Sequence, residues 1–178
     1  MRIIGGKLKG HKLKGIGKRT TRAITDRVKE SIFGILGDVS GRRVLDLFAG
    51  TGSLGIEALS RGAREVVFID CDRGCVKTIR RNLSTLGLRA HIYGEDIGRG
   101  LRKLPAEKFD LIFVDPPFKS NLAEQTLEDL NQFKLIASEG VVVVRHHSKK
   151  SLPERVGGLK LSRREKYGEN IVCFYNLD

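Results

Sequence analysis

A tetrapeptide in the second half of the chain has residue types that suit chemistry on a planar amine. Asp115-Pro116-Pro117-Phe118 directly follows the predicted strand 109–114, whose last four residues are apolar. Two prolines after a strand end its pairing and fix the backbone, which leaves the Asp115 carboxylate and the Pro116 carbonyl as hydrogen-bond acceptors. These acceptors suit the two N–H groups of an exocyclic amine, and the Phe118 ring suits stacking on its base. The tetrapeptide therefore predicts an amine-binding site; a rigid turn with a buried Phe is the alternative.

A glycine-rich loop forms the second candidate site. Gly50, Gly52 and Gly55 have GxGxxG spacing between a predicted strand and a predicted helix, and Asp70 ends the next strand, 20 residues after Gly50. This context is typical of folds that bind nucleotide cofactors, in which the acid accepts hydrogen bonds from ribose hydroxyls. Because Ile56 and not lysine follows Gly55, a GxxxxGK[ST] phosphate loop is excluded. A tight turn without a ligand is the alternative.

Asp46 favours S-adenosylmethionine over a dinucleotide, because an acid inside the preceding strand suits a cationic ligand better than a pyrophosphate. Asp-x-Phe-x-Gly-x-Gly at 46–52, with Asp70, resembles motifs I and II of class I S-adenosylmethionine-dependent methyltransferases. The Asp115–Phe118 tetrapeptide resembles their motif IV for planar amines. Asp96 and Ile97 follow the third predicted strand, where such enzymes hold the adenine; an N-cap role for Asp96 is the alternative. We therefore expect the cofactor to contact Asp46, Phe48, Ala49, Gly50, Thr51, Gly52, Asp70, Cys71, Asp96 and Ile97.

Basic residues are concentrated near the start of the chain. Residues 1–29 hold ten Lys and Arg and one Asp, so this segment carries +9 of the formal charge of +12. A basic segment attached to a remainder in which positive and negative charges nearly balance is typical of nucleic-acid binding, and a solubilising tail is the alternative. Glycines and apolar residues between the lysines predict an ordered hairpin. The candidate RNA-binding residues are Arg2, Lys7, Lys9, Lys12, Lys14, Arg22 and Arg27.

Strands and helices alternate along the remainder of the chain. Predicted strands span 44–48, 65–69, 89–93, 109–114 and 141–144, and predicted helices begin near 25, 53, 72, 97 and 122; a hairpin pairs 160–165 with 171–176. The pattern predicts an α/β fold, Rossmann-like and doubly wound, with a mainly parallel seven-stranded sheet, an antiparallel C-terminal hairpin strand and an N-terminal basic β-hairpin. We expect a basic arm at 1–24 and a catalytic domain at 25–178.

Composition excludes several classes of protein. At 178 residues and 40% hydrophobic residues the chain has the size and composition of one globular domain. No apolar run reaches the ~18–20 residues of a membrane span, and the first residues lack the apolar stretch of a signal peptide, so we expect a cytoplasmic protein without a membrane partner. Three Cys and four His lack metal-ligand spacing, so no metal is expected. Oligomeric state is left open, with a monomer as the default.

The chain resembles the RsmD family along almost its whole length, on the segments 1–6, 25–30, 45–63 and 114–118. The resemblance implies methylation of N2 of one guanine in bacterial 16S ribosomal RNA, in an assembled or assembling 30S particle. It also implies S-adenosylmethionine held by 46–52, Asp70 and Asp96, the guanine amine at 115–118, and RNA on the basic hairpin. One departure is Ala23-Ile24 after Arg22, where the family usually has Pro-Thr.

Two other functions remain open from the residues alone. DNA adenine and protein glutamine amino-methyltransferases use a related tetrapeptide, although many of them carry Asn where this chain has Asp115. An RNA-binding assembly factor that keeps the fold without catalysis is the third hypothesis, and the intact glycine loop, Asp70 and 115–118 together argue against it.

Overall fold

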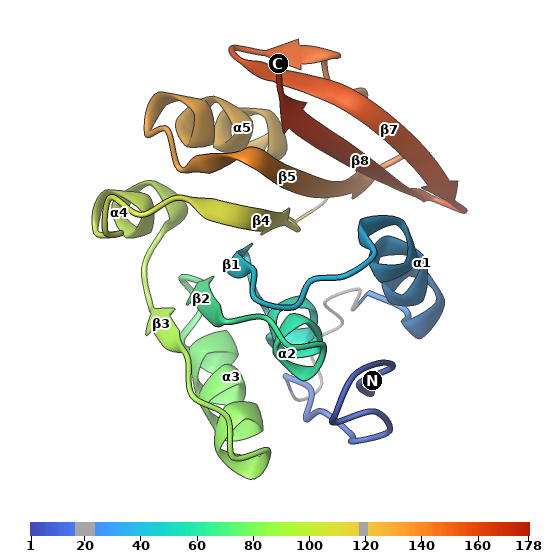
Figure 1. Ribbon diagram of the computed structural model, residues 1–178, viewed down its shortest axis with the longest axis vertical. Helices are drawn as coiled ribbons and strands as arrows, with labels where there is room; N and C mark the ends of the chain where they lie inside the picture. Colours follow the sequence, from blue (N-terminus) through green and yellow to red (C-terminus); the bar gives the residue numbers. More distant parts are fainter. Residues whose placement is uncertain (17–23, 118–120) are drawn as a thin grey trace.

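A central sheet organises the molecule (Figure 1). The computed structural model describes residues 1–16, 24–117 and 121–178. Within these ranges eight strands are ordered β3-β2-β1-β4-β5-β8-β7-β6. They are β1 (Arg43–Leu47), β2 (Glu65–Ile69), β3 (His91–Tyr93), β4 (Phe109–Val114), β5 (Ile136–His147), β6 (Arg155–Val156), β7 (Leu159–Tyr167) and β8 (Asn170–Leu177). The first five are parallel, and β8 pairs antiparallel with β5. The α/β doubly wound prediction is confirmed.

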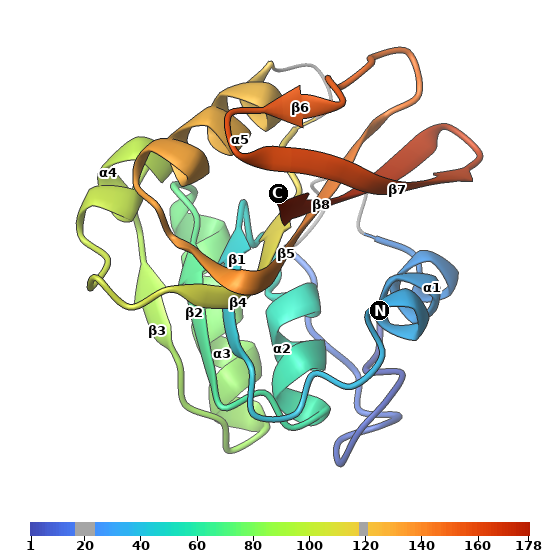
Figure 2. The same ribbon diagram turned by 45° about the horizontal axis from the view of Figure 1, so that its top comes forward.

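Helices cover both faces of the sheet. They are α1 (Asp26–Leu36), α2 (Ser53–Ser60), α3 (Arg73–Thr85), α4 (Ile97–Arg102) and α5 (Leu122–Gln132). Figure 2 shows α1, α2 and α3 on one side and α4 and α5 on the other. Successive residues of β1 therefore pack into different cores, Val44 with the first group and Leu45 with the second. Burial on both faces explains the uninterrupted apolar runs 66–69, 111–114 and 141–144 in the parallel strands.

Side-chain caps begin the helices where the sequence predicts them. The Thr25 hydroxyl accepts from the Val28 amide at the start of α1. The Asp72 carboxylate accepts from the amides of Gly74 and Cys75 at the start of α3. These bonds satisfy amide groups that have no partner within the helix, so the cap residues fix where each helix begins.

The sheet and the N-terminal segment differ from the prediction. The sheet has eight strands and not seven, because the two-residue β6 is too short to leave a periodic pattern. The predicted N-terminal β-hairpin reverses direction but forms only an isolated bridge between Arg2 and Lys12 among the described residues. Its turn lies against α2: a Cβ on Gly6, whose φ is +74°, would be 1.8 Å from the Ser60 carbonyl oxygen. Main-chain groups of this segment bond to α2, and this replaces a longer cross-strand ladder.

The N-terminal segment is part of the main core. Ile3 and Leu13 are buried in the same apolar cluster as Phe33 of α1. Segment 1–16 thus packs on the catalytic domain predicted for 25–178. Among the described helices, none has the length and apolar character needed to cross a membrane.

Candidate active site

A cavity of about 920 Å³ opens beyond the carboxyl ends of β1, β2, β4 and β5. This is the edge at which open parallel sheets bind ligands. Ten of the predicted site residues line it: Asp46, Phe48, Ala49, Gly50, Thr51, Asp70, Cys71, Asp115, Pro116 and Pro117. The structure therefore brings the predicted cofactor loop and the predicted amine site into one cavity.

The glycine loop has the backbone conformations that its composition predicts. Gly50 and Gly52 have φ of +58° and +76°, in the left-handed region that favours glycine. Gly55 has a packing role, because a Cβ there would lie 2.3 Å from the Phe68 ring of β2. Phe48, predicted as the end of the strand, instead follows β1 with φ of +56° and turns the chain into the loop.

Asp46 and Asp70 hold the two sides of this loop. The Asp46 carboxylate, 1% exposed, accepts from the Gly55 amide at 2.9 Å. The Asp70 carboxylate accepts from the amides of Gly50 at 2.8 Å and Asp72 at 2.9 Å. Burial raises the pKa of Asp46 well above its ordinary value of 3.8, against the Gly55 hydrogen bond, and repulsion from nearby carboxylates adds to it. Burial also raises the pKa of Asp70. A cationic ligand in the cavity would relieve this repulsion and desolvation.

Asp115 is held by a residue that the sequence analysis missed. Arg145, near the end of β5, donates from Nε to Asp115 Oδ1 and from Nη2 to Oδ2, each at 2.7 Å. Burial raises the pKa of Asp115 and the Arg145 charge opposes that rise. A two-point arginine–carboxylate pair fixes the plane of the carboxylate, whose further lone pairs remain able to accept. The available signal was a charged residue directly after the buried run 141–144.

Three predicted cofactor residues lie outside the lining of this cavity. Gly52 is in the turn behind it. Asp96 accepts from the Arg99 amide as the N-cap of α4, and its side chain is 58% exposed. Ile97 is the first residue of that helix. The alternative role for Asp96 is thus the one seen, and adenine binding by Asp96 and Ile97 stays a prediction. Phe118 and Arg22 lie outside the described residues.

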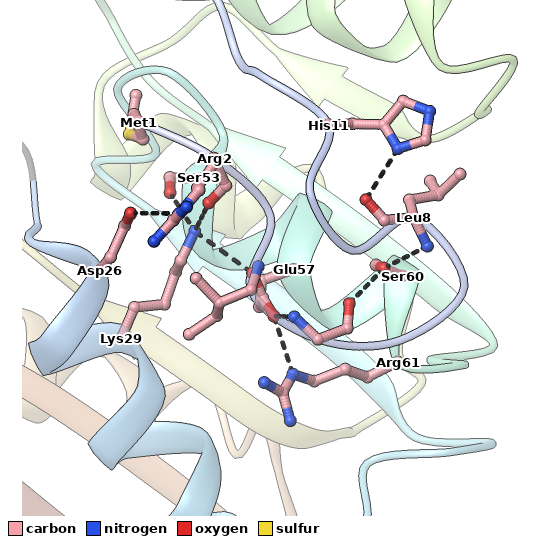
Figure 3. Close-up of polar contacts among 12 residues, drawn as sticks. Met1, Arg2, Leu8, His11, Asp26, Lys29, Ser53, Glu57, Ser60 and Arg61 are labelled. Atoms are coloured by element: carbon pink, nitrogen blue, oxygen red, sulfur yellow. Dashed lines mark hydrogen bonds and ion pairs between the residues drawn. The ribbon is translucent and has the colours of Figure 1, made fainter.

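A buried polar cluster anchors the N-terminal segment on α1 and α2 (Figure 3). Lys29 and Glu57 are fully buried and form an ion pair of 3.2 Å between Nζ and Oε2. The Glu57 carboxylate accepts from the amides of Ile4 and Gly5, and Lys29 Nζ donates to the Arg2 carbonyl. Lys29, which the sequence analysis counts in the +9 segment, is therefore not part of the exposed charge. Its charge is matched by Glu57.

The predicted RNA-binding side chains are at the surface. Those within the described ranges, Arg2, Lys7, Lys9, Lys12, Lys14 and Arg27, are all exposed. Arg2 forms a surface ion pair with Asp26. Met1 and Ile24 line the cavity from the same part of the chain, and the Thr51 hydroxyl donates to the Met1 sulfur at 3.6 Å. The basic surface thus borders the cofactor loop. Across the described residues, no group of three or more His, Cys, Asp or Glu is arranged to hold a metal ion.

Comparison with known proteins agrees with this geometry. A family model described as conserved hypothetical protein 95 matches residues 1–176. A protein of Bacillus subtilis (strain 168), "Putative rRNA methyltransferase YlbH", is 41% identical, covering 98% of each chain. Ribosomal RNA small subunit methyltransferase D of Escherichia coli (strain K12) is 34% identical, over 98% of this chain and 89% of that protein. The chain belongs to the RsmD family.

Solved structures support the assignment to the RsmD family. The structure of yhhF from Escherichia coli superposes with a TM-score of 0.90 at 32% identity, covering 100% of this chain and 98% of that one. S-adenosylmethionine is the cofactor that the family and fold imply. The cavity fits it: buried carboxylates with raised pKa values suit a cation, and the glycines of the loop leave room for a ligand beside the backbone.

Proposed function

We propose that the protein transfers a methyl group from S-adenosylmethionine to the exocyclic N2 of a guanine in small-subunit (16S) ribosomal RNA, within an assembled or assembling 30S particle. The observation that carries the proposal is the single cavity shared by the glycine loop and Asp115–Pro117. The names of the E. coli and B. subtilis relatives support ribosomal RNA as the substrate class. The exposed basic residues beside the cavity supply the charge that an RNA substrate needs.

The residues around the loop would hold the cofactor. Phe48 to Thr51 line the cavity and would contact the cofactor, and Asp70 would offer carboxylate lone pairs to ribose hydroxyls in addition to the two amide hydrogen bonds it already accepts. Asp46, which lines the same cavity, would stabilise a cationic ligand and be favoured in its ionised form by it. When bound, S-adenosylmethionine supplies a methyl group activated by a positively charged sulfur.

Asp115 and Pro116 prepare the amine. A guanine N2 lone pair is delocalised into the ring, so the nitrogen is a poor nucleophile until hydrogen bonds to its two N–H groups draw it toward tetrahedral geometry and localise the lone pair. We assign one N–H to the Asp115 carboxylate and the other to the Pro116 carbonyl, both on the turn that follows β4. Positioning and electrostatics are then the main contributions of the protein, and the proton that N2 loses on methylation would pass through the Asp115 carboxylate to water. The Arg145 charge favours the ionised form of Asp115, and an ionised carboxylate can only accept hydrogen bonds.

Methyl transfer to particles that lack the modification tests the proposal. The protein is incubated with labelled S-adenosylmethionine and 30S subunits from a strain deleted for the endogenous enzyme, and the RNA is digested to nucleosides for mass spectrometry. We expect label on N2-methylguanosine for the wild type and for Glu139→Ala, a change to an exposed acid at the far end of β5. Asp115→Ala should lose turnover and still bind S-adenosylhomocysteine in calorimetry. Label on adenine or on protein alone would overturn the assignment of guanine.

A further inference from the structure

Helix α3 presents a basic surface that the sequence analysis did not identify. Its exposed cations are Arg73, Lys77, Arg80 and Arg81, and residues 73–94 contain no Asp or Glu. Arg73, Lys77 and Arg81 are four residues apart in turn, so they share one face of the helix. Within the described parts of the chain none of these cations forms an ion pair.

This arrangement is unfavourable for the isolated helix. Like charges four residues apart repel each other by a few tenths of a kcal/mol, roughly 0.2–0.5 per pair, and no acid on α3 offsets them. Arg73 is the first residue of α3, the end at which the helix dipole disfavours a cation. The helix is stable because its other face is buried through Val76, Ile79 and Leu83. The basic face therefore does not serve the stability of the helix.

The N-terminal segment runs alongside this helix and adds to the same surface. The Lys14 amide donates to Asn82 Oδ1 at 2.8 Å, and Asn82 Nδ2 donates back to the Lys14 carbonyl at 3.2 Å. Two residues later Ile16 lies near the start of α3, where a Cβ on Gly74 would be 3.7 Å from its Cγ2. Residues 14–16 thus pass antiparallel to α3. The exposed Lys14 is consequently a neighbour of the helix cations, and the exposed Lys12 lies two residues before it.

The surface begins at the rim of the cavity. Asp72 and Cys75, at the first turn of α3, line the cavity, and Arg73 lies between them in sequence. From Arg73 to Arg81 the helix rises about 12 Å at ~1.5 Å per residue. Asn82 also donates to the Thr51 carbonyl at 3.0 Å, which joins this surface to the glycine loop. A nucleotide chain with one base in the cavity would meet these cations as it leaves the rim.

We propose that the exposed face of α3, together with Lys12 and Lys14, binds phosphates of the RNA strand that flanks the target nucleotide. The inference rests on the proposed function, since it requires an RNA substrate in the cavity. The partner is a polyanion with regularly spaced phosphates. A surface of arginine and lysine without acids matches such a backbone and has no base selectivity of its own.

Two triple variants that remove equal charge test the proposal. The first is Arg73→Gln/Lys77→Gln/Arg81→Gln. The matched control is Arg64→Gln/Arg102→Gln/Lys108→Gln, whose exposed cations flank the amino ends of β2 and β4, away from the cavity. Affinity for a 16S ribosomal RNA transcript is measured at several potassium chloride concentrations. Glutamine is a good helix former, and thermal unfolding of both variants checks that they are folded.

We expect the α3 variant to reduce the slope of log K against log salt by about 2–3 and to weaken binding on the order of 100-fold at 0.1 M salt, because each lost phosphate contact removes ~0.7–0.9 of slope. The single variant Lys77→Gln should give about a third of the slope change. With 30S subunits as substrate, KM should rise while kcat and S-adenosylhomocysteine affinity stay at wild-type values. The control triple should leave the slope unchanged.

Three results would overturn the inference in different ways. Equal losses in both triple variants would mean that only net charge matters. A wild-type slope in the α3 variant would mean that the basic face of α3 is exposed to solvent and does not contact phosphates. If the wild-type protein methylates no RNA, the proposed function is wrong and this inference fails with it. If the wild-type protein methylates RNA and the α3 variant binds RNA normally, only this inference is wrong.

Discussion

Replacing Lys29 with methionine tests whether the buried ion pair anchors the N-terminal segment. Lys29 Nζ makes three polar contacts in the structure: Glu57 Oε2 at 3.2 Å, the Arg2 carbonyl at 2.6 Å and the Ser53 hydroxyl at 3.2 Å. Methionine keeps much of the apolar length of the side chain, so the change removes the charge and its hydrogen bonds with little loss of packing. Glu57 would remain buried, with the two amides and Arg61 as its partners.

The expected loss of unfolding free energy is about 3 kcal/mol. Removing one partner of a buried ion pair costs roughly 3–5 kcal/mol because the other charge stays buried without compensation. The lower end applies here, since Arg61, a quarter exposed, still pairs with Glu57 at 2.9 Å. Adding Glu57→Gln should recover part of the loss, because the stranded charge is then gone. The two changes should therefore be non-additive by about 1 kcal/mol or more.

Urea denaturation of the single and double variants measures these differences. Arg2→Gln is the control, because its ion pair with Asp26 joins side chains that are 65% and 37% exposed and should contribute less than about 1 kcal/mol. The reasoning is refuted if Lys29→Met costs no more than this control, or if the two changes at the buried pair simply add. Hydrogen exchange should also quicken at the amides of Ile4 and Gly5, which bond to Glu57.

Three further predictions concern the cavity and its loop. Gly55→Ala, which places a Cβ against the packed Phe68 ring, should lower the free energy of unfolding by about 1–3 kcal/mol. Gly34→Ala, at an open position of α1, should raise it by about 0.5–1 kcal/mol. Thermal or urea unfolding measures both differences. Because the folded protein raises the pKa of Asp46, it binds more protons than the unfolded chain above pH 3.8, and stability falls as pH rises through that range. Asp46→Asn should therefore be more stable than wild type by a margin that grows with pH, while calorimetry shows weaker S-adenosylhomocysteine binding; an equal margin at all pH values would contradict this. Arg145→Gln should move the acidic limb of the kcat/KM profile to higher pH, because the Arg145 charge lowers the pKa of Asp115. If the variant is less stable but its acidic limb does not move, the role of Arg145 is structural only.

Local chemistry explains which elements could be predicted. Strands β2 and β4 have the predicted bounds, since their apolar runs, 66–69 and 111–114, are each followed directly by an aspartate that ends the run. The start of α3 is set by one side chain, Asp72, which acts on amides two and three residues away. Interactions of this range are visible in a sequence. The two-residue β6 and the docking of the Gly6 turn on α2 were not predictable in this way, because their geometry is set by contacts with distant elements.

The features of the candidate site also divide into short-range patterns, which the sequence shows, and long-range contacts, which it does not. The glycine spacing, the acids at 46 and 70 and the tetrapeptide at 115 are each short-range patterns, and the parallel sheet brings them together because all three lie at strand ends. The pairing of Asp115 with Arg145 spans 30 positions, and it depends on the adjacency of β4 and β5. Formal charge alone could not show that Lys29 is buried and neutralised, nor that the cations of α3 lie beside Lys14.

The sequence by itself thus determined the class of cofactor, and it predicted a site for a planar amine and a surface for a polyanion. These depend on residue types at short spacing. Only the tertiary structure decided which charges face water and which face each other, because burial and pairing are properties of side chains brought together from distant positions. Arg145 against Asp115, Lys29 against Glu57 and α3 beside the N-terminal segment all have that origin.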